Sequence, residues 1–193
     1  MRNSNMNILA IGVGGQGIIL ASDILAYTLM EAGYDVKKSE VHGMSQRGGS
    51  VSSHIRFGKN VYSPIIKDGE VDILFAFEQL EALRYFGLLN ADTRVILDSH
   101  TINPPSVSLG IDEYPKDIPG IIKEHFTDLH LADALDLARK VGNPKTTNVV
   151  LLGILSSYLE VDEPNWLKGI SKVLPEKLVN INIEAFRLGR DEG

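Results

Sequence analysis

Residues 7–41, NILAIGVGGQGIILASDILAYTLMEAGYDVKKSEV, decide the fold class. The short apolar run Asn7–Ile11 is followed at once by a glycine, which is typical of a buried strand. After Gly17 the apolar residues recur with helical spacing, and Gly33 suits the position just past a helix. Tyr34–Val41 has the pattern of a second strand. The segment therefore predicts a strand, a glycine turn, a helix and a strand, which is the start of a βαβ unit.

Outside this opening, several more segments have the pattern of strands: 48–57, 61–66, 71–77, 94–98 and, as a short edge strand, 126–129. The first two predict a β-hairpin, because residues 58–60, GKN, supply turn residues between them. Beyond residue 130 the apolar spacing is helical. We therefore expect one α/β domain over residues 1–193, with three layers and a Rossmann-like, mostly parallel sheet. It should carry an inserted β-hairpin and a helical C-terminal third.

Composition excludes several classes of function. The chain has 193 residues, of which 44% are apolar and 23% charged, as in a folded globular protein. The net charge of -6 and the absence of a Lys/Arg cluster argue against nucleic-acid or anionic-membrane partners. The N-terminus lacks the pattern of a signal peptide, and the apolar run 149–155 is too short to span a bilayer. We expect a cytoplasmic protein.

The sequence contains no cysteine. This excludes a disulfide, a thiolate zinc site, a cysteine nucleophile and a cysteine-ligated iron–sulfur cluster within the chain. The histidines, aspartates and glutamates have no spacing that predicts a metal site, so we expect none.

The glycine turn after the first strand is the first candidate site. It fits the pattern GxGxxG, in which backbone N–H groups and a helix N-terminus can meet an anion such as a diphosphate. Its candidate contact residues are Gly12, Gly14, Gly15, Gln16 and Gly17. A dinucleotide site also needs a carboxylate about 20 residues further on, and Glu40 could serve. The alternative is a tight turn that needs glycine for close packing and binds nothing.

The second candidate site lies in residues 40–57, EVHGMSQRGGSVSSHIRF, which gather polar side chains on glycine-rich backbone. Arg47 can bind a carboxylate or phosphate through two hydrogen bonds, Gln46 can donate and accept, and His42 can transfer a proton near neutral pH. Gly48 and Gly49 allow close approach of the backbone to a ligand. By contrast, His54 and Arg56 alternate with apolar residues, which predicts a strand face that meets solvent or a partner.

Four stretches together carry a family resemblance: GVGGQGIILASDIL (12–25), EVHGMSQRGGSVSSHIRFG (40–58), YSPII (62–66) and GEVDILFAFEQLEALRY (69–85). In this order and spacing they resemble the gamma subunit or domain of 2-oxoacid:ferredoxin oxidoreductases. INPPSV (102–107) and GNPKTTNVVLLG (142–153) make the chain most similar to the beta subunits of the indolepyruvate ferredoxin oxidoreductases in that family.

The resemblance implies a complex that oxidatively decarboxylates aryl pyruvates, joins the acyl group to coenzyme A and reduces ferredoxin. It implies that thiamine diphosphate and the iron–sulfur clusters sit on a larger partner subunit, through which ferredoxin is reached. This chain would bind no cofactor alone and would act as an accessory catalytic subunit. Alternatives are a subunit for another 2-oxoacid, a stand-alone NAD(P)-binding Rossmann domain, and a pure assembly module.

The two candidate sites are expected to meet. Open α/β folds bind ligands at the carboxyl edge of the sheet. We therefore expect Gly12–Gly17 and His42–Gly49 to line one shared crevice at that edge, covered by the partner subunit.

Overall fold

The computed structural model describes residues 5–42 and 49–193. Strands in this part of the chain form one sheet: β1 (Met6–Val13), β2 (Asp35–His42), β3 (Ser50–Gly58), β4 (Ile73–Ala76), β5 (Arg94–Asp98) and β6 (Leu129–Ala132). The helices are α1 (Ile18–Glu31), α2 (Gln79–Arg84), α3 (Pro105–Ser108), α4 (Ile118–His125), α5 (Ala134–Lys140), α6 (Thr147–Ser157), α7 (Glu163–Val173) and α8 (Glu176–Glu192). Two short 3-10 helices, η1 (Phe86–Leu88) and η2 (Pro144–Thr146), complete the set.

The six-stranded sheet has the order β2-β3-β1-β4-β5-β6. Strands β1, β4, β5 and β6 pair in parallel, whereas β3 is antiparallel to both of its neighbours, β1 and β2. Strand β2 therefore runs in the same direction as β1 but is separated from it by β3. The expected mostly parallel α/β sheet is confirmed, and the βαβ start is present with one strand inserted between its two strands.

The predicted partner of β3 in the hairpin was wrong. Residues 61–66 form no strand, and β3 instead forms the hairpin with β2. Because β1 and β2 occupy both edges of β3, no edge is left to pair with residues 61–66. That segment is held against β3 by side chains: the Arg56 guanidinium donates to the carbonyls of Ser63 and Ile65, and the Ile66 N–H donates to Nδ1 of His54 at 3.3 Å.

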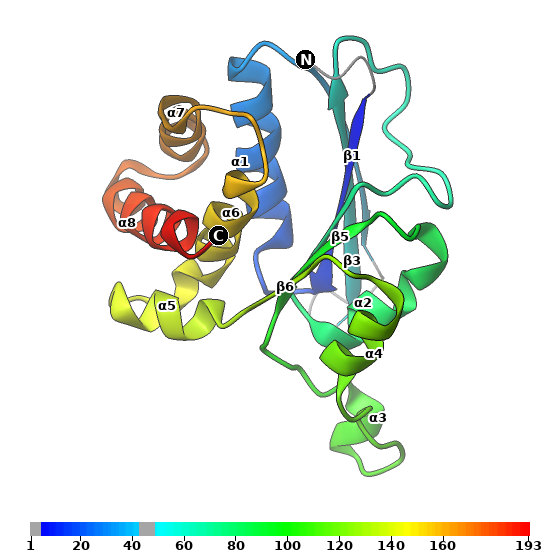
Figure 1. Cartoon of the computed structure of the whole chain (residues 1–193). Helices are drawn as coiled ribbons and strands as arrows, with labels where there is room; N and C mark the ends of the chain where they lie inside the picture. Colours follow the sequence, from blue (N-terminus) through cyan, green and yellow to red (C-terminus); the bar gives the residue numbers. More distant parts are fainter. Residues whose placement is uncertain (1–4, 43–48) are drawn as a thin grey trace.

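Helices cover both faces of the sheet and make three layers (Figure 1). Helices α1, α5, α6, α7 and α8 lie on one face, and α2 and α4 on the other. Along β1 the buried side chains alternate between these two cores, with Ile8 on the α1 side and Leu9 on the α2 side. The helical C-terminal third is confirmed. The expected edge strand begins at Leu129 rather than at Phe126, which ends α4 as its C-cap.

Helix α6 occupies the centre of the thicker layer. All its residues from Asn148 to Ser156 are buried, so it is covered on every side. It crosses α8 at two glycines: a Cβ on Gly153 would lie 2.1 Å from the Phe186 carbonyl oxygen, and one on Gly189 would lie 2.0 Å from that of Val150. The two helices therefore touch backbone to backbone. Among the described helices, none is both long enough and apolar enough to cross a bilayer.

This crossing gives a stability prediction. We expect Gly153→Ala to lower the free energy of unfolding by about 1–3 kcal/mol, because the added methyl group forces α6 and α8 apart. Gly87→Ala is the matched control, since its Cβ would meet nothing within 4 Å and its φ is not positive. Urea unfolding of both variants measures the difference. Equal stabilities would contradict the close crossing.

Candidate functional site at the carboxyl edge of the sheet

After β1 and after β4 the chain turns to opposite faces of the sheet. After β1 it enters α1 on one face of the sheet, and after β4 it enters α2 on the other (Figure 1). The two strands are parallel neighbours, so their carboxyl ends open a crevice between the diverging connections. Open α/β sheets place ligands at such a switch point.

The Gln16 side chain fixes this crevice. The ladder between β1 and β4 ends where the Phe77 N–H donates to the Ile11 carbonyl at 2.9 Å. In a regular parallel ladder the Val13 N–H would next donate to the Phe77 carbonyl. Instead the Val13 N–H donates to Oε1 of Gln16 at 2.7 Å, and Nε2 of Gln16 donates to the Phe77 carbonyl at 2.6 Å. The carboxamide thus takes the place of one rung and holds the strand ends apart.

Two glycines of the turn are explained by close approach. A Cβ on Gly12 would lie 2.6 Å from Oε1 of Gln16 and 2.9 Å from the Phe77 Cβ, so glycine makes room for the inserted amide. Gly17 has φ +79°, and its Cβ would lie 2.5 Å from Nδ2 of Asn148. That amide donates to the Gly17 carbonyl at 3.2 Å, which ties the turn to α6. Gly15 also has a positive φ, of +106°.

The second candidate segment reaches the same edge. His42 pairs with Val51 at the end of β2, and the Gly14 N–H donates to the Gly49 carbonyl at 2.9 Å. The glycine turn and the residue that precedes β3 are therefore in direct contact. Gln46, Arg47 and Gly48 lie outside the described residues, so their contact with a ligand and the shared crevice stay predictions.

The prediction of a solvent-facing side chain was wrong for His54, which residues 61–66 cover. Arg56 on the same strand face is half-buried, and its guanidinium bonds to that segment. His54 is 9% exposed, and burial lowers the pKa of its imidazole below the usual range. Nε of Arg56 donates to Oδ1 of Asn7 at 2.8 Å, in addition to its bonds to the covering loop. Both residues organise the fold.

A cleft of about 480 Å³, here called the glycine-turn cleft, lies beside Gln16. Gly17 begins α1 and Thr147 begins α6, so two helix N-termini meet in its wall. Neither helix has an acidic residue in its first turn or a side-chain cap, and the Lys145 side chain also lines the cleft. Helix N-termini and a lysine favour an anion. The remaining lining residues are Gly15, Gln16, Leu20, Phe77, Asp98, His100, Ile102, Leu135, Pro144 and Asn148.

Asp98 contributes a titratable group to this cleft that the sequence analysis missed. It ends β5 and is 2% exposed. Burial raises the pKa of its carboxyl to about 6, although the N–H groups of Ala134 and His100 partly oppose the shift. One sequence signal could have identified Asp98: it is a carboxylate at the carboxyl end of the buried parallel strand RVILD.

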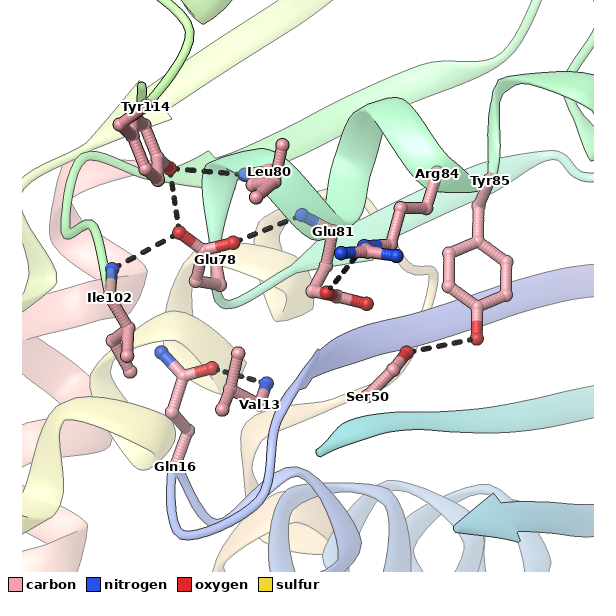
Figure 2. Close-up of polar contacts among 10 residues, drawn as sticks. All are labelled: Val13, Gln16, Ser50, Glu78, Leu80, Glu81, Arg84, Tyr85, Ile102 and Tyr114. Atoms are coloured by element: carbon pink, nitrogen blue, oxygen red, sulfur yellow. Dashed lines mark hydrogen bonds and ion pairs between the residues drawn. The ribbon is translucent and has the colours of Figure 1, made fainter. Parts of the chain in front are cut away.

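A second cleft, of about 330 Å³, opens on the other side of the crevice and is here called the α2 cleft. Its most buried polar group is Glu78, which is 1% exposed and caps α2 by accepting the Glu81 N–H at 3.0 Å. Oε1 of Glu78 also accepts the Tyr114 hydroxyl at 2.7 Å and the Ile102 N–H at 3.1 Å (Figure 2). The Tyr114 hydroxyl therefore anchors the loop after β5.

The arrangement departs from a dinucleotide site in two ways. The strand that carries Glu40 is not the neighbour of β1, because β3 lies between them. Lys38 also forms an ion pair with Glu40. Within residues 5–42 and 49–193, no group of three or more His, Asp or Glu side chains is gathered where it could hold a metal ion.

The inserted amide can be tested by substitution. We expect Gln16→Met to lower the free energy of unfolding by about 1–3 kcal/mol, because the buried Val13 N–H and Phe77 carbonyl lose their partners while the side-chain length is kept. Urea unfolding measures the change. A loss below about 0.5 kcal/mol, the range of surface substitutions, would contradict the proposed rung.

Asp98 gives a prediction for pH dependence. Its folded pKa of about 6 exceeds the ordinary 3.8, so the folded state binds the proton more tightly and loses stability as pH rises between these values. Asp98→Asn cannot ionise, and we expect it to be more stable than the parent by about 3 kcal/mol above pH 7. The difference should shrink as pH falls toward 4 and vanish only well below 3.8, where both states are protonated. A difference in unfolding free energy that stays constant with pH would refute the shifted carboxyl.

Comparison with known proteins identifies relatives of this chain. Residues 7–192 match the family model described as pyruvate ferredoxin/flavodoxin oxidoreductase. The chain is 42% identical over 188 residues to indolepyruvate oxidoreductase subunit IorB of Pyrococcus horikoshii, covering 95% of this chain and 93% of the relative. It is 41% identical over 188 residues, with the same coverage, to subunit IorB of Thermococcus kodakarensis.

Solved structures share the fold. The gamma subunit of a keto/oxoacid ferredoxin oxidoreductase from Geobacter sulfurreducens superposes with a TM-score of 0.71 at 23% identity, over 97% of each chain. The 2-oxoglutarate:ferredoxin oxidoreductase from Magnetococcus marinus, solved with 2-oxoglutarate, coenzyme A and succinyl-CoA bound, gives 0.76 at 21% identity. That match covers 97% of this chain and 31% of the other. With the family match over almost its whole length, the chain belongs to the pyruvate ferredoxin/flavodoxin oxidoreductase family.

Proposed function

We propose that this chain is the accessory catalytic subunit of an indolepyruvate:ferredoxin oxidoreductase. The complex would oxidatively decarboxylate aryl pyruvates, transfer the acyl group to coenzyme A and reduce ferredoxin. The observation that carries the proposal is the identity of 36–42% to four proteins named indolepyruvate oxidoreductase subunit IorB, across at least 95% of this chain.

The cofactors are assigned to the partner subunit. The chain has no cysteine, so its residues do not fit a thiolate-held iron–sulfur cluster. We therefore place the clusters and thiamine diphosphate on a larger subunit, through which electrons reach ferredoxin. We propose that the complex works in the cytoplasm.

The glycine-turn cleft is the part of this chain that we assign to the reaction. The oxoacid and coenzyme A are both anions, and this cleft combines two helix N-termini with Lys145. The Magnetococcus marinus relative binds coenzyme A and its oxoacid in the crystal. We propose that Gly12, Gly14, Gly15, Gln16 and Gly17, with His42, Gln46, Arg47, Gly48 and Gly49, form the wall that faces the ligand or the partner.

A second candidate is a subunit for another 2-oxoacid, since substrate choice can reside on the larger subunit. The candidate from another class, a stand-alone NAD(P)-binding domain, is disfavoured by the position of β3 and by the Gln16 amide inside the turn. It predicts heat of binding when NAD(H) or NADP(H) is titrated into the isolated chain.

Reconstitution tests the proposed function directly. The chain should be co-expressed with the larger subunit encoded beside it, and ferredoxin reduction should be followed with indolepyruvate, pyruvate and a branched-chain oxoacid. We expect turnover that requires coenzyme A and both subunits, and that is fastest with indolepyruvate. A complex that prefers another oxoacid supports the second candidate, and the absence of any oxoacid-dependent reduction contradicts the proposal.

Arg47 gives a sharper test of the site. We expect Arg47→Ala to lower kcat/KM by at least about tenfold in the reconstituted complex, because a bidentate contact to a carboxylate or phosphate is lost. Arg139→Ala is the control, since Arg139 is exposed on α5. Steady-state kinetics with coenzyme A and oxoacid varied separately identify the ligand. If turnover and both KM values of the assembled complex are unchanged while the affinity between the subunits falls, the chain is an assembly module.

A further inference from the structure

The α2 cleft contains a buried hydrogen-bond acceptor that lacks a donor. Glu81 lines the cleft from the first turn of α2 and is 5% exposed. Its Oε1 accepts from Nε of Arg84 at 2.9 Å, while its Oε2 is buried without a hydrogen-bond partner in the part of the chain that the structure describes (Figure 2). A buried polar atom left unpaired costs about 1–3 kcal/mol, and more when it is charged. Such a group calls for an explanation, and a donor supplied by another molecule is one.

The neighbouring carboxylate, Glu78, does not lack hydrogen-bond donors. Glu78 receives the Tyr114 hydroxyl and two backbone N–H groups, all from within the chain. Glu81 is therefore the acceptor that the fold leaves open. Ser50, at the start of β3, lies on the same wall, and its hydroxyl is 3.4 Å from that of Tyr85. These residues come from α2, with its two caps, and from the start of β3, so the cleft is built on rigid elements.

The charge of the cleft selects the occupant. Among the described residues that line the cleft, two carboxylates, Glu78 and Glu81, face one guanidinium, Arg84, whose side chain is 57% exposed. The balance is negative, so the cleft repels the carboxylate of an oxoacid and the phosphates of coenzyme A. An ammonium or guanidinium group fits both the sign of the charge and the missing donor.

The rim of the cleft fits a protein surface. Pro104, Pro105 and Ser108 line the cleft from the loop that contains α3, which extends beyond the carboxyl edge of the sheet (Figure 1). The same loop exposes Leu109 by 75% and Ile111 by 72%. Apolar side chains beside a desolvated polar acceptor are the composition of a protein–protein interface.

We propose that the larger subunit docks on this face and inserts a lysine or arginine side chain whose N–H donates to Oε2 of Glu81. The proposal rests on the chain acting as a subunit of the oxidoreductase complex. Leu109 and Ile111 pack against the same partner and exclude water from the ion pair. The glycine-turn cleft, on the other side of the crevice, stays available for the anionic ligands.

The first test compares Glu81→Gln with Glu184→Gln, an exposed glutamate on α8 that serves as the matched control. The Kd of each variant for the larger subunit is measured by titration calorimetry. We expect Glu81→Gln to weaken binding by at least about tenfold, because the partner's buried cation loses its counter-charge. The control should bind as the parent does. An unchanged Kd for Glu81→Gln overturns the proposal.

A stability measurement separates docking from folding. In the isolated chain, Glu81→Gln should leave the melting temperature unchanged or raise it, because a neutral amide replaces a buried carboxylate that is satisfied at only one of its two oxygens. A lower melting temperature together with weaker binding would mean that Glu81 serves the fold, and this outcome also overturns the proposal.

The sign of the charge is tested at Arg84. Arg84→Gln makes the cleft more negative, so a cationic occupant should bind more tightly and with a steeper salt dependence. Weaker binding would mean that the cleft receives an anion, and the proposal would be wrong. If the parent chain itself does not bind the larger subunit, the proposed function fails first; binding by the parent with unaltered variants defeats this inference alone.

Discussion

The insertion of one side-chain amide between two parallel strands organises the carboxyl edge of this protein. Because the Gln16 carboxamide replaces a rung between β1 and β4, the strand ends separate where the chain turns to opposite faces. Gly12 must lack a side chain to admit the amide, and Gly17 must adopt a positive φ to start α1 beside Asn148. The glycine pattern that resembles a dinucleotide fingerprint is thus explained largely by the chain's own packing.

The crevice separates two clefts of different character. Among the described lining residues, the glycine-turn cleft combines helix N-termini and a lysine with the Asp98 carboxyl, whereas the α2 cleft combines two carboxylates with one arginine. Ile102 lines both clefts, and its N–H donates to Glu78. The loop after β5 is therefore the wall between them. An anionic ligand and a cationic partner group can occupy neighbouring positions on one edge without competing for the same side chains.

Local sequence patterns predicted those helices and strands that depend on residues close together in the sequence. The pattern of apolar residues and glycines predicted β1, α1 and β2. The sequence motifs alone predicted the family to which the chain belongs. The partner of β3 was missed because strand pairing is a contact between distant residues, and the turn signal at 58–60 favoured the nearer segment. The hydrogen bond between Glu78 and Tyr114 was missed for the same reason. The two residues are 36 positions apart, and the local sequence around neither of them predicts the contact. His54 showed the alternation of an exposed face, but a loop covers it.

The crossing of α6 and α8 has a consequence for how the protein is made. Residues 149–155 of α6 are apolar on every side, with the sheet-facing layer on one side and α8 on the other. Until α8 (Glu176–Glu192) leaves the ribosome, it cannot cover the side of α6 that it contacts in the folded protein. The sheet can assemble while translation continues, yet its thicker layer closes only when α8 arrives. A ribosome stalled before α8 would hold a nascent chain with a bare apolar helix, which is the kind of surface that chaperones bind.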